Sequence, residues 1–254
     1  MTTVQDVLQF IETIAPTYMK EHWDKVGLNC GRLDKPVKRI LVALDPFQSV
    51  CEEAVRKGAD LLVTHHALIW TPGFITDSDE QGRNTLYLIE NGIACINAHT
   101  NLDCAPGGVN DALAAVLGLE NVQPLGAYGG MMRYGDVPEQ SLTQFLGFVK
   151  EQLHCDGLRY CDGGKPVRKV AVGGGSCSDG LYDALQAGCD TFVTSDVKYN
   201  GFWDAKEQGL SLIDAGHFHT ENPVIAVLAA KISAQFPEIE VKISETHWDC
   251  MKYY

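Results

Sequence analysis

The sequence predicts an internally duplicated α/β protein with mostly parallel sheets flanked by helices. Two observations predict this fold class: the chain repeats itself, and each copy alternates apolar runs of strand length with segments of helical periodicity. At 254 residues, 45% hydrophobic and 21% charged, the chain has an ordinary globular composition and enough length for two cores. We expect two halves, residues 1–125 and 126–254, packed closely together as one unit.

The repeat is visible at two offsets. When the chain is shifted by 130 residues, residues 36–66 align with residues 166–196 without a gap, and eight of the 31 positions are identical. A shift of 117 residues aligns residues 90–98 with residues 207–215, where four of nine positions are identical. A duplicated supersecondary unit explains both alignments.

The first copy predicts a β-α-β unit. Residues 40–44 and 61–64 are short apolar runs of strand length, and residues 48–57 between them show helical periodicity. Alternation of strands and helices is typical of parallel sheets covered by helices.

The second copy repeats this order and extends it. Predicted strands at 170–172, 191–194 and 210–213 alternate with helices near 181–187 and 202–208. Outside the repeated blocks, the periodicity predicts further helices near residues 3–14, 108–117, 142–153 and 223–234.

Charge and apolar pattern disfavour several classes of protein. The net charge of −13 would repel phosphate backbones, so general nucleic-acid binding is not expected. The longest apolar run, residues 223–230, is far shorter than the roughly 20 residues that a bilayer requires. The first 20 residues also lack the charge order of a secretory signal. We expect a soluble, cytoplasmic protein without membrane association. Its nine cysteines, never spaced C-x-x-C, are expected to be reduced and mostly buried.

The candidate chemistry follows the predicted strands. Ligands of parallel α/β sheets gather beyond the carboxyl ends of the strands. Three such ends are rich in histidine and carboxylate residues. They carry His65 and His66, then His99 and Asp103, and finally Asp214, His217, His219 and Glu221.

Histidine mixed with carboxylates, without cysteine, predicts a dinuclear site for divalent metals. We predict that five residues form it: His65, His66, Asp103, His217 and Glu221. The adjacent His65 and His66 can share one site only if the strand has ended before them or if each binds a different ion. Asn222 and Pro223 predict the start of a helix, so the preceding ligands are expected in the approach to that helix rather than on its face. Asp103 is expected to precede its helix in the same way.

Simpler interpretations exist for each residue alone. A single histidine at a strand end is often a surface or capping group, and Asp103 could cap the helix after Pro106. His99 and His219 are candidates for supporting or acid-base roles, with solvated loop histidines as the alternative. The remaining histidines, His22, His154 and His247, are expected to be structural or superficial. The glycine run at 173–175 is compatible with a phosphate-binding turn, although no complete phosphate-binding motif is present.

Several segments of the sequence carry a resemblance to known proteins: Trp23-Asp24-Lys25-Val26-Gly27-Leu28, Leu44-Asp45-Pro46, Val63-Thr64-His65-His66, His99-Thr100-Asn101-Leu102-Asp103, Val193-Thr194-Ser195-Asp196-Val197-Lys198-Tyr199 and Asp214-Ala215-Gly216-His217 with Glu221. Together they resemble one family, the Nif-three-like proteins, also named GTP cyclohydrolase I type II homologues. The resemblance covers nearly the whole chain. It departs from the family's usual pattern at Ala67, Ser195 and Asn200, which puts substrate contacts near Ser195 and Asn200 in doubt.

The resemblance implies two intertwined α/β halves, a pair of divalent ions and a toroidal homohexamer with its sites facing the internal cavity. The ions could be zinc, iron or manganese, and the family's ligands fall on the same five residues, with Glu221 as a bridge. We predict a metal-dependent hydrolase of a nucleotide or related heterocycle that acts through metal-activated water, with His99 or Glu221 relaying the proton. GTP ring opening is the version that the family name implies. The alternative is a non-catalytic regulatory or metal-handling ring protein that binds protein partners, and DNA binding is a weaker third.

Overall fold

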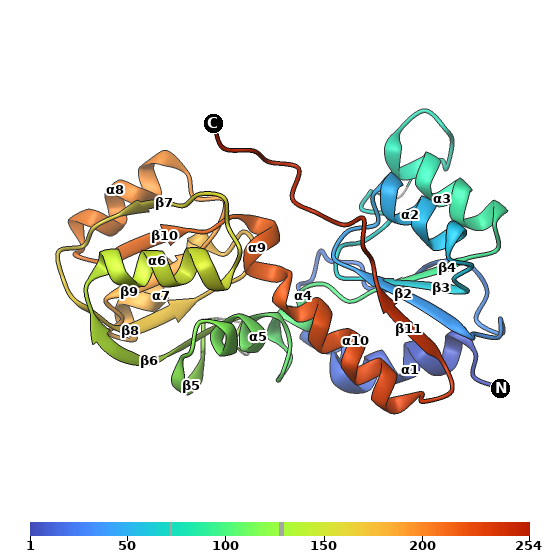
Figure 1. Ribbon diagram of the computed structural model, residues 1–254, viewed down its shortest axis with the longest axis horizontal. Coiled ribbons are helices and arrows are strands. Elements are labelled where there is room, and N and C mark those ends of the chain that lie inside the picture. The colour runs from blue at the N-terminus through green and yellow to red at the C-terminus, as the bar shows by residue number, and fades with distance from the viewer. Residues whose placement is uncertain (72, 127–129) are drawn as a thin grey trace. The chain divides into compact units, whose positions relative to one another are not determined.

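The computed structural model describes residues 1–71, 73–126 and 130–254 and shows an α/β protein with two sheets (Figure 1). The chain forms two compact units, residues 1–105 with 225–248 and residues 106–224 with 249–254. This division differs from the predicted boundary between residues 125 and 126, which falls at the end of a strand inside the second unit. The C-terminal helix and strand return to the first unit, so its sheet includes a strand from the far end of the sequence.

The first unit contains a five-stranded sheet in the order β1-β4-β3-β2-β11. Its elements are α1 (Val4–Ile14), η1 (Thr17–Met19), β1 (Gly27–Cys30), β2 (Arg39–Ala43), α2 (Gln48–Arg56), β3 (Leu61–Thr64), α3 (Glu80–Glu90), β4 (Ala94–Asn97), α4 (Thr100–Cys104), most of α10 (Pro223–Gln235) and β11 (Glu240–Ile243). All described pairings in this sheet are parallel except that of β1 with β4. Apolar residues of β2, β3 and β4 pack against α2 and α3, while α1 and α10 cover the other face (Figure 1).

The second unit contains a six-stranded sheet in the order β5-β6-β8-β9-β10-β7. Its elements are α5 (Val109–Val116), β5 (Glu120–Leu125), β6 (Met132–Gln140), α6 (Leu142–Gln152), β7 (Arg159–Cys161), β8 (Val167–Val172), η2 (Ser178–Gly180), α7 (Leu181–Gln186), β9 (Thr191–Thr194), α8 (Tyr199–Glu207), β10 (Ser211–Asp214) and α9 (His217–Glu221). Three of its five described pairings are antiparallel, so the expectation of a mostly parallel sheet holds for the first unit only.

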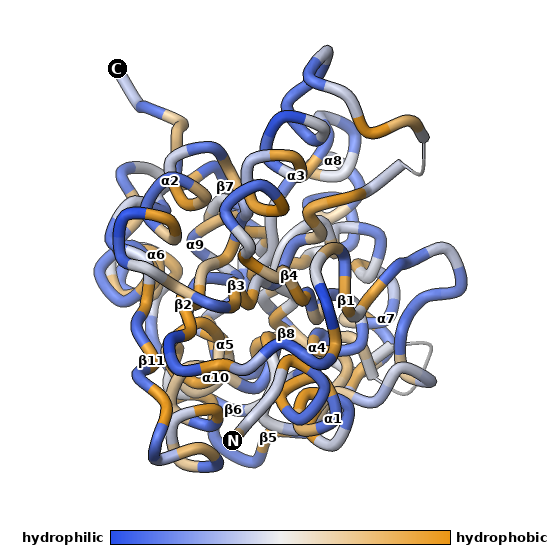
Figure 2. The backbone as a smooth tube through the Cα atoms, turned by 90° about the vertical axis from the view of Figure 1, so that its right-hand side faces the viewer, coloured by the Kyte–Doolittle hydropathy of each residue, from blue (hydrophilic) through white to orange (hydrophobic). Residues whose placement is uncertain are grey.

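Alternating side chains of the central strands form two cores in the second unit. Val172 and Val193 face the core that contains α5 and α6, whereas Ala171 and Phe192 face the core that contains α7 and α8. This follows from the two-residue period of a strand, which places successive side chains on opposite faces. In the first unit, Figure 2 shows a hydrophobic β3 and an α3 that carries both hydrophilic and hydrophobic residues.

Strand register confirms the duplication. In the first sheet Val42 pairs with Val63, and in the second sheet Val172 pairs with Val193, each 130 residues further along the chain. The strands β4 and β10 are each followed by a five-residue helix, α4 and α9. The two units therefore present equivalent strand ends.

The buried Glu53 of α2 fastens the chain after β11 to the first unit. Its carboxylate accepts hydrogen bonds from the Ser244 hydroxyl at 2.5 Å, the Thr246 hydroxyl at 2.7 Å and the Glu245 amide at 3.0 Å, and it pairs with Lys57 at 2.7 Å. Burial alone would raise the pKa of Glu53, but these bonds outweigh it and lower the pKa to about 2. The ionised carboxylate is therefore part of the folded state.

Two further expectations concern the cysteines and membrane segments. All nine cysteines are free thiols and six of them are buried, as expected. Burial raises the pKa of Cys51 and Cys155, each to about 12. Among the described residues, no helix has the length and apolar character needed to cross a bilayer.

Candidate metal centre

The first unit brings together three imidazoles that follow β3 and β4. His65 and His66 lie directly after β3, and the Thr64 hydroxyl donates to the His66 carbonyl at 2.7 Å, which closes a turn there. The two rings lie 4.8 Å apart between centroids, and His99 lies 5.1 Å from His65. Donor atoms of the three histidines lie within 4.8 Å of one another. The strand ends at Thr64, before the two histidines, and both therefore contribute to one cluster, as expected from the sequence.

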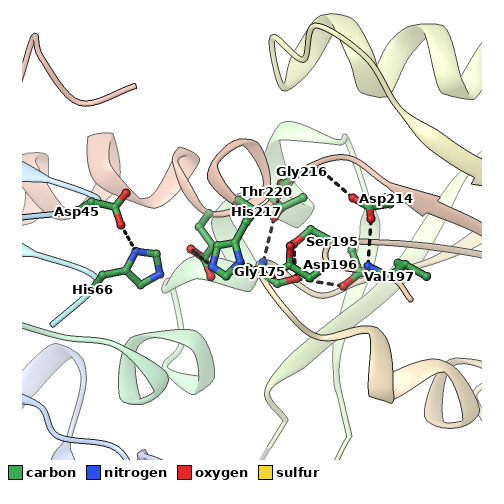
Figure 3. A network of polar contacts seen from close by, with 12 residues as sticks. Asp45, His66, Gly175, Ser195, Asp196, Val197, Asp214, Gly216, His217 and Thr220 are labelled. Atoms are coloured by element: carbon green, nitrogen blue, oxygen red, sulfur yellow. Dashed lines mark hydrogen bonds and ion pairs between the residues drawn. The ribbon is translucent and has the colours of Figure 1, made fainter. Parts of the chain in front are cut away.

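Hydrogen bonds orient the first two imidazoles. Nδ1 of His65 lies 2.9 Å from the Ala98 carbonyl, which can only accept, so Nδ1 carries a proton and, in the neutral ring, the lone pair is on Nε2. Nδ1 of His66 lies 2.6 Å from Asp45 Oδ1 (Figure 3). An oxygen acceptor on one ring nitrogen is the usual support of a metal-binding histidine, because it sets the tautomer and the ring orientation.

Asp103 supplies a carboxylate to the same cluster. It lies within α4, and its Oδ1 is 3.6 Å from His65 Nε2. The expectation that Asp103 precedes its helix is wrong, since the chain forms a separate five-residue helix before Pro106. The helix after Pro106 begins at Val109 with Gly108 as its N-cap, so Asp103 does not cap it either.

The second unit holds the other two predicted ligands on α9. His217 and Glu221 lie one turn apart on this helix, with His217 Nε2 at 3.1 Å from Glu221 Oε2. The expectation that they lie in the approach to a helix is wrong, because α9 forms its own helical turn directly before α10. Nδ1 of His217 lies 2.7 Å from Asp196 Oδ2, so this ring has the same kind of support as His66 (Figure 3).

The glycine run after β8 makes room for Glu221. Gly175 has φ +63°, and a Cβ atom there would lie 2.0 Å from Glu221 Oε1 and 3.1 Å from His217 Nε2. The Gly173 and Gly174 amides donate to the Val193 carbonyl and the Asn110 side chain. The Gly175 amide donates to the Thr220 hydroxyl (Figure 3). Because these amides are engaged, the interpretation of this turn as a phosphate cradle is wrong.

His99 is held by a buried carboxylate. Its Nδ1 lies 3.0 Å from Asp24 Oδ2, and that oxygen also accepts from the Thr100 amide at 3.0 Å and the Thr100 hydroxyl at 2.5 Å. Burial alone would raise the pKa of Asp24, but the hydrogen bond and charge of His99 and the bonds from Thr100 hold it well below its usual range. Asp24 and His99 have the arrangement of an acid-base histidine with its orienting carboxylate.

The remaining candidate residues have structural partners. His219 contacts the Leu153 carbonyl at 3.0 Å and Asp249 at 3.3 Å, so it joins α9 to neighbouring segments of its unit. Asp214 accepts from the amides of Val197 at 3.0 Å and Gly216 at 3.2 Å (Figure 3). Of the other histidines, His22 and His154 are exposed, and His247 contacts the Ser244 carbonyl.

The donor chemistry of both clusters fits divalent metal ions. Bonds of about 2.1 Å at tetrahedral to octahedral angles place two ligand atoms of one ion about 3.0 to 3.4 Å apart. The separation of His217 Nε2 and Glu221 Oε2, 3.1 Å, lies in this range. Asp196 accepts the proton of His217 Nδ1, so in the neutral ring the lone pair is on Nε2. This lone pair and the Glu221 carboxylate are both acceptors, so a proton or a metal ion must lie between them. That the five predicted ligands form one site stays a prediction.

Three further site residues, Asp24, Asp45 and Asp196, were not among those predicted from the sequence. Asp45 and Asp196 come shortly after β2 and β9, so the search beyond strand ends could have found them. Asp24 follows no strand, and its partner Thr100 lies 76 residues away in the sequence. Only the folded chain reveals that contact.

Comparisons with known proteins agree with this architecture. Residues 2–249 match the model of a family described as Duf34/NIF3 (NGG1p interacting factor 3). A GTP cyclohydrolase 1 type 2 homolog of Clostridium perfringens is 34% identical and covers 98% of this chain and 99% of its own. A protein of the same name from Streptomyces coelicolor is 37% identical, with 98% and 90% covered.

Solved structures show the same fold. The Bacillus cereus protein related to NIF3 matches with a TM-score of 0.93 at 24% identity, over 100% of this chain and 99% of that one. Reduced HcgD from Methanocaldococcus jannaschii matches with a TM-score of 0.84 at 31% identity, over 96% and 98%. Because the family model matches residues 2–249 and curated relatives match nearly the whole chain, the chain belongs to the Duf34/NIF3 family.

Proposed function

We propose that this protein is a metal-dependent hydrolase of a nucleotide or a related heterocycle. His65, His66, Asp103, His217 and Glu221 would hold two divalent ions, zinc, iron or manganese. The observation that carries the proposal is the clustering of donor atoms: those of His65, His66 and His99 lie within 4.8 Å of one another, and His217 Nε2 lies 3.1 Å from Glu221 Oε2. His65, His66 and His217 also have Nδ1 against an oxygen acceptor, which is the usual support of a metal-binding histidine.

The chain's own residues supply the proton chemistry. A bound divalent ion would lower the pKa of its water to about 7 and so provide hydroxide near neutral pH. His99, with Asp24 on its Nδ1, presents Nε2 for accepting or donating a proton. Glu221 is the second candidate proton acceptor, because its carboxylate is buried beside His217.

The names of the relatives support the substrate class, and bound metal ions would make it compatible with the charge of the chain. Curated relatives along nearly the whole chain are named GTP cyclohydrolase 1 type 2 homologs. A chain with net charge −13 would repel a polyphosphate, and bound divalent cations would offset that repulsion locally. We further propose a homo-oligomeric assembly, a toroidal hexamer, which sedimentation equilibrium would test.

The test is metal-dependent turnover of GTP and other nucleoside triphosphates by the parent protein and by Asp103→Asn. We expect turnover in the parent with added Zn²⁺, Mn²⁺ or Fe²⁺ and a loss of at least about 100-fold in the variant, because a charged ligand is removed. His154→Asn is the matched control, since His154 is exposed, has φ 54° and lies outside both clusters. Equal turnover in parent and Asp103→Asn would exclude the catalytic role. Metal binding without turnover of any nucleotide would favour the metal-handling alternative.

A further inference from the structure

Two exposed tryptophans flank His99 in the first unit. Trp23 is 54% exposed, and its ring lies 6.0 Å from that of His99 between centroids. Trp70 is 45% exposed and lies 5.0 Å from His99 and 6.1 Å from His66. Large indole surfaces open to water are unfavourable, and they commonly mark a binding surface. Here both of them border the imidazole that the proposed function assigns to proton transfer.

The backbone around Trp70 is held by side chains of two other elements. The amides of Leu68 and Ile69 donate to Asn29 Oδ1 at 2.9 and 3.2 Å, and the Trp70 amide donates to Gln81 Oε1 at 2.7 Å. Asn29 lies in β1 and Gln81 in α3. The main chain that carries the Trp70 indole is therefore anchored. This reduces the conformational entropy that the segment would lose when a ligand binds.

Trp23 is anchored just as firmly through its neighbour Asp24. The Asp24 carboxylate accepts from the Lys25 amide at 2.7 Å and from the Thr100 amide at 3.0 Å, and it contacts His99. The same contacts that orient His99 thus set the position of the Trp23 backbone. The main chain that carries each indole is therefore anchored beside one imidazole.

We propose that Trp23 and Trp70 form a stacking surface for the planar base of the substrate, beside the His99 imidazole. The proposal rests on the proposed function and adds the residues that would select the substrate. Indole faces attract planar aromatic rings through stacking, whereas their negative π-face does not attract an anionic phosphate group. A nucleotide base is therefore the part of the substrate that this surface would bind, and the aliphatic and anionic parts would lie elsewhere.

The experiment measures separately how the protein binds the base and the sugar phosphate of a nucleotide. Equilibrium dialysis measures the Kd of guanosine, which lacks phosphate, and of ribose 5-phosphate, which lacks a base, for the metal-loaded parent, Trp23→Ala and Trp70→Ala. We expect the guanosine Kd to rise about 5- to 100-fold in each variant, the range for loss of one stacking contact. We expect the ribose 5-phosphate Kd to stay within twofold. Trp70→Phe should restore most of the guanosine affinity, because a planar ring remains.

Trp203→Ala is the matched control. Trp203 is 46% exposed, similar to Trp70, but it lies on α8 of the second unit against Lys206. The proposal is overturned if the parent shows no saturable guanosine binding, or if the Kd is unchanged in Trp23→Ala and Trp70→Ala. It is also overturned if these variants change only the sedimentation coefficient, since the indoles would then be contacts between copies of the chain.

Turnover by the parent and by Asp103→Asn, compared with guanosine binding by the tryptophan variants, distinguishes this proposal from the proposed function. If the hydrolase assignment fails but stacking holds, turnover is absent in the parent and guanosine affinity still depends on both tryptophans. If stacking alone fails, turnover remains sensitive to Asp103→Asn while the tryptophan variants keep the parent's guanosine affinity. Metal content of each tryptophan variant should equal that of the parent.

Discussion

The two units place different chemistry at equivalent positions of one repeated scaffold. In the first unit Asp45, after β2, supports His66, after β3. At the positions 130 residues later the second unit has Gly175 and Asp196, and here the aspartate supports His217, which comes from α9. The position that carries an imidazole in one unit carries its supporting carboxylate in the other. The strand ends are equivalent in the two units, but the second unit takes its imidazole from α9 and has a glycine where the first unit has its supporting aspartate.

The short helices after β4 and β10 differ by one position. Asp103 of α4 aligns with Thr220 of α9 at the offset of 117, so Glu221 lies one residue further along. The longer glutamate reaches the space above Gly175, where any side chain would collide with it. The first unit has Asp45 at the position of Gly175. The loss of that side chain in the second unit leaves room for Glu221, the carboxylate ligand there.

The sheet edges show the other difference between the units. The first sheet ends in β11, whose continuation is fastened by Glu53, whereas the second sheet ends in the antiparallel pair β5 and β6. At the position equivalent to Glu53 the second unit has Asp183, which is only partly buried. The buried carboxylate network is therefore a feature of the first unit.

The largest expected effect is that of Glu53→Ala on stability. We expect a loss of about 3 kcal/mol in the free energy of unfolding of the first unit, because several buried donors lose their acceptor. Thermal unfolding and hydrogen exchange of residues 240–246 measure it. Asp183→Ala, the control at the equivalent position, should cost less than about 1 kcal/mol. Equal effects of the two substitutions would contradict the asymmetry between the units.

Gly175→Ala should disrupt the cluster of the second unit. The new Cβ atom would displace the Glu221 carboxylate, and we expect metal affinity to fall about 100-fold, as when a ligand's support is lost. Gly188→Ala is the control for backbone strain, because Gly188 has φ +76° and no atom within 4 Å of the added Cβ. Chelator competition measures the affinity. If Gly188→Ala lowers it as much, the steric explanation is wrong.

Removing the two supporting aspartates compares the clusters directly. Asp45→Ala and Asp196→Ala should each lower metal affinity about 10-fold or more. We expect the larger loss for Asp45→Ala, because the side chain of Asp45 is 15% exposed and that of Asp196 is 48% exposed, so water screens the second contact more. Asp204→Ala, on the exposed side of α8, controls for the change in net charge. A larger loss in Asp196→Ala would reverse this ranking.

The Glu53 network should also make stability depend on acid pH. The pKa of Glu53 is lowered to about 2 in the folded state from an ordinary value of 4.5, so its contribution is complete above the ordinary value. That contribution should be lost as the pH falls from about 4.5 towards 2. Unfolding midpoints measured across this range should converge for the parent and Glu53→Gln at low pH. Parallel curves would show that Glu53 does not titrate with folding.

The central strands and their ends could be predicted from the sequence, because their signals are local. β3 has the predicted bounds, and the histidines after it lie in one cluster. β5 could not be predicted, since its side chains are mostly exposed and lack alternation. Helices α4 and α9 are too short to show a period. The return of β11 to β2 and the contact of Asp24 with Thr100 are long-range, and no window of sequence contains them.

The metal content of protein purified without chelator or nickel affinity tests the central claim most directly. Elemental analysis of the parent, His66→Ala, Glu221→Ala and the control His154→Asn covers one ligand from each unit. We predict close to two divalent ions per chain in the parent and the control, and a sharp fall in both ligand variants. No metal in the parent after reconstitution, or equal metal in all four proteins, would contradict the assignment of these clusters.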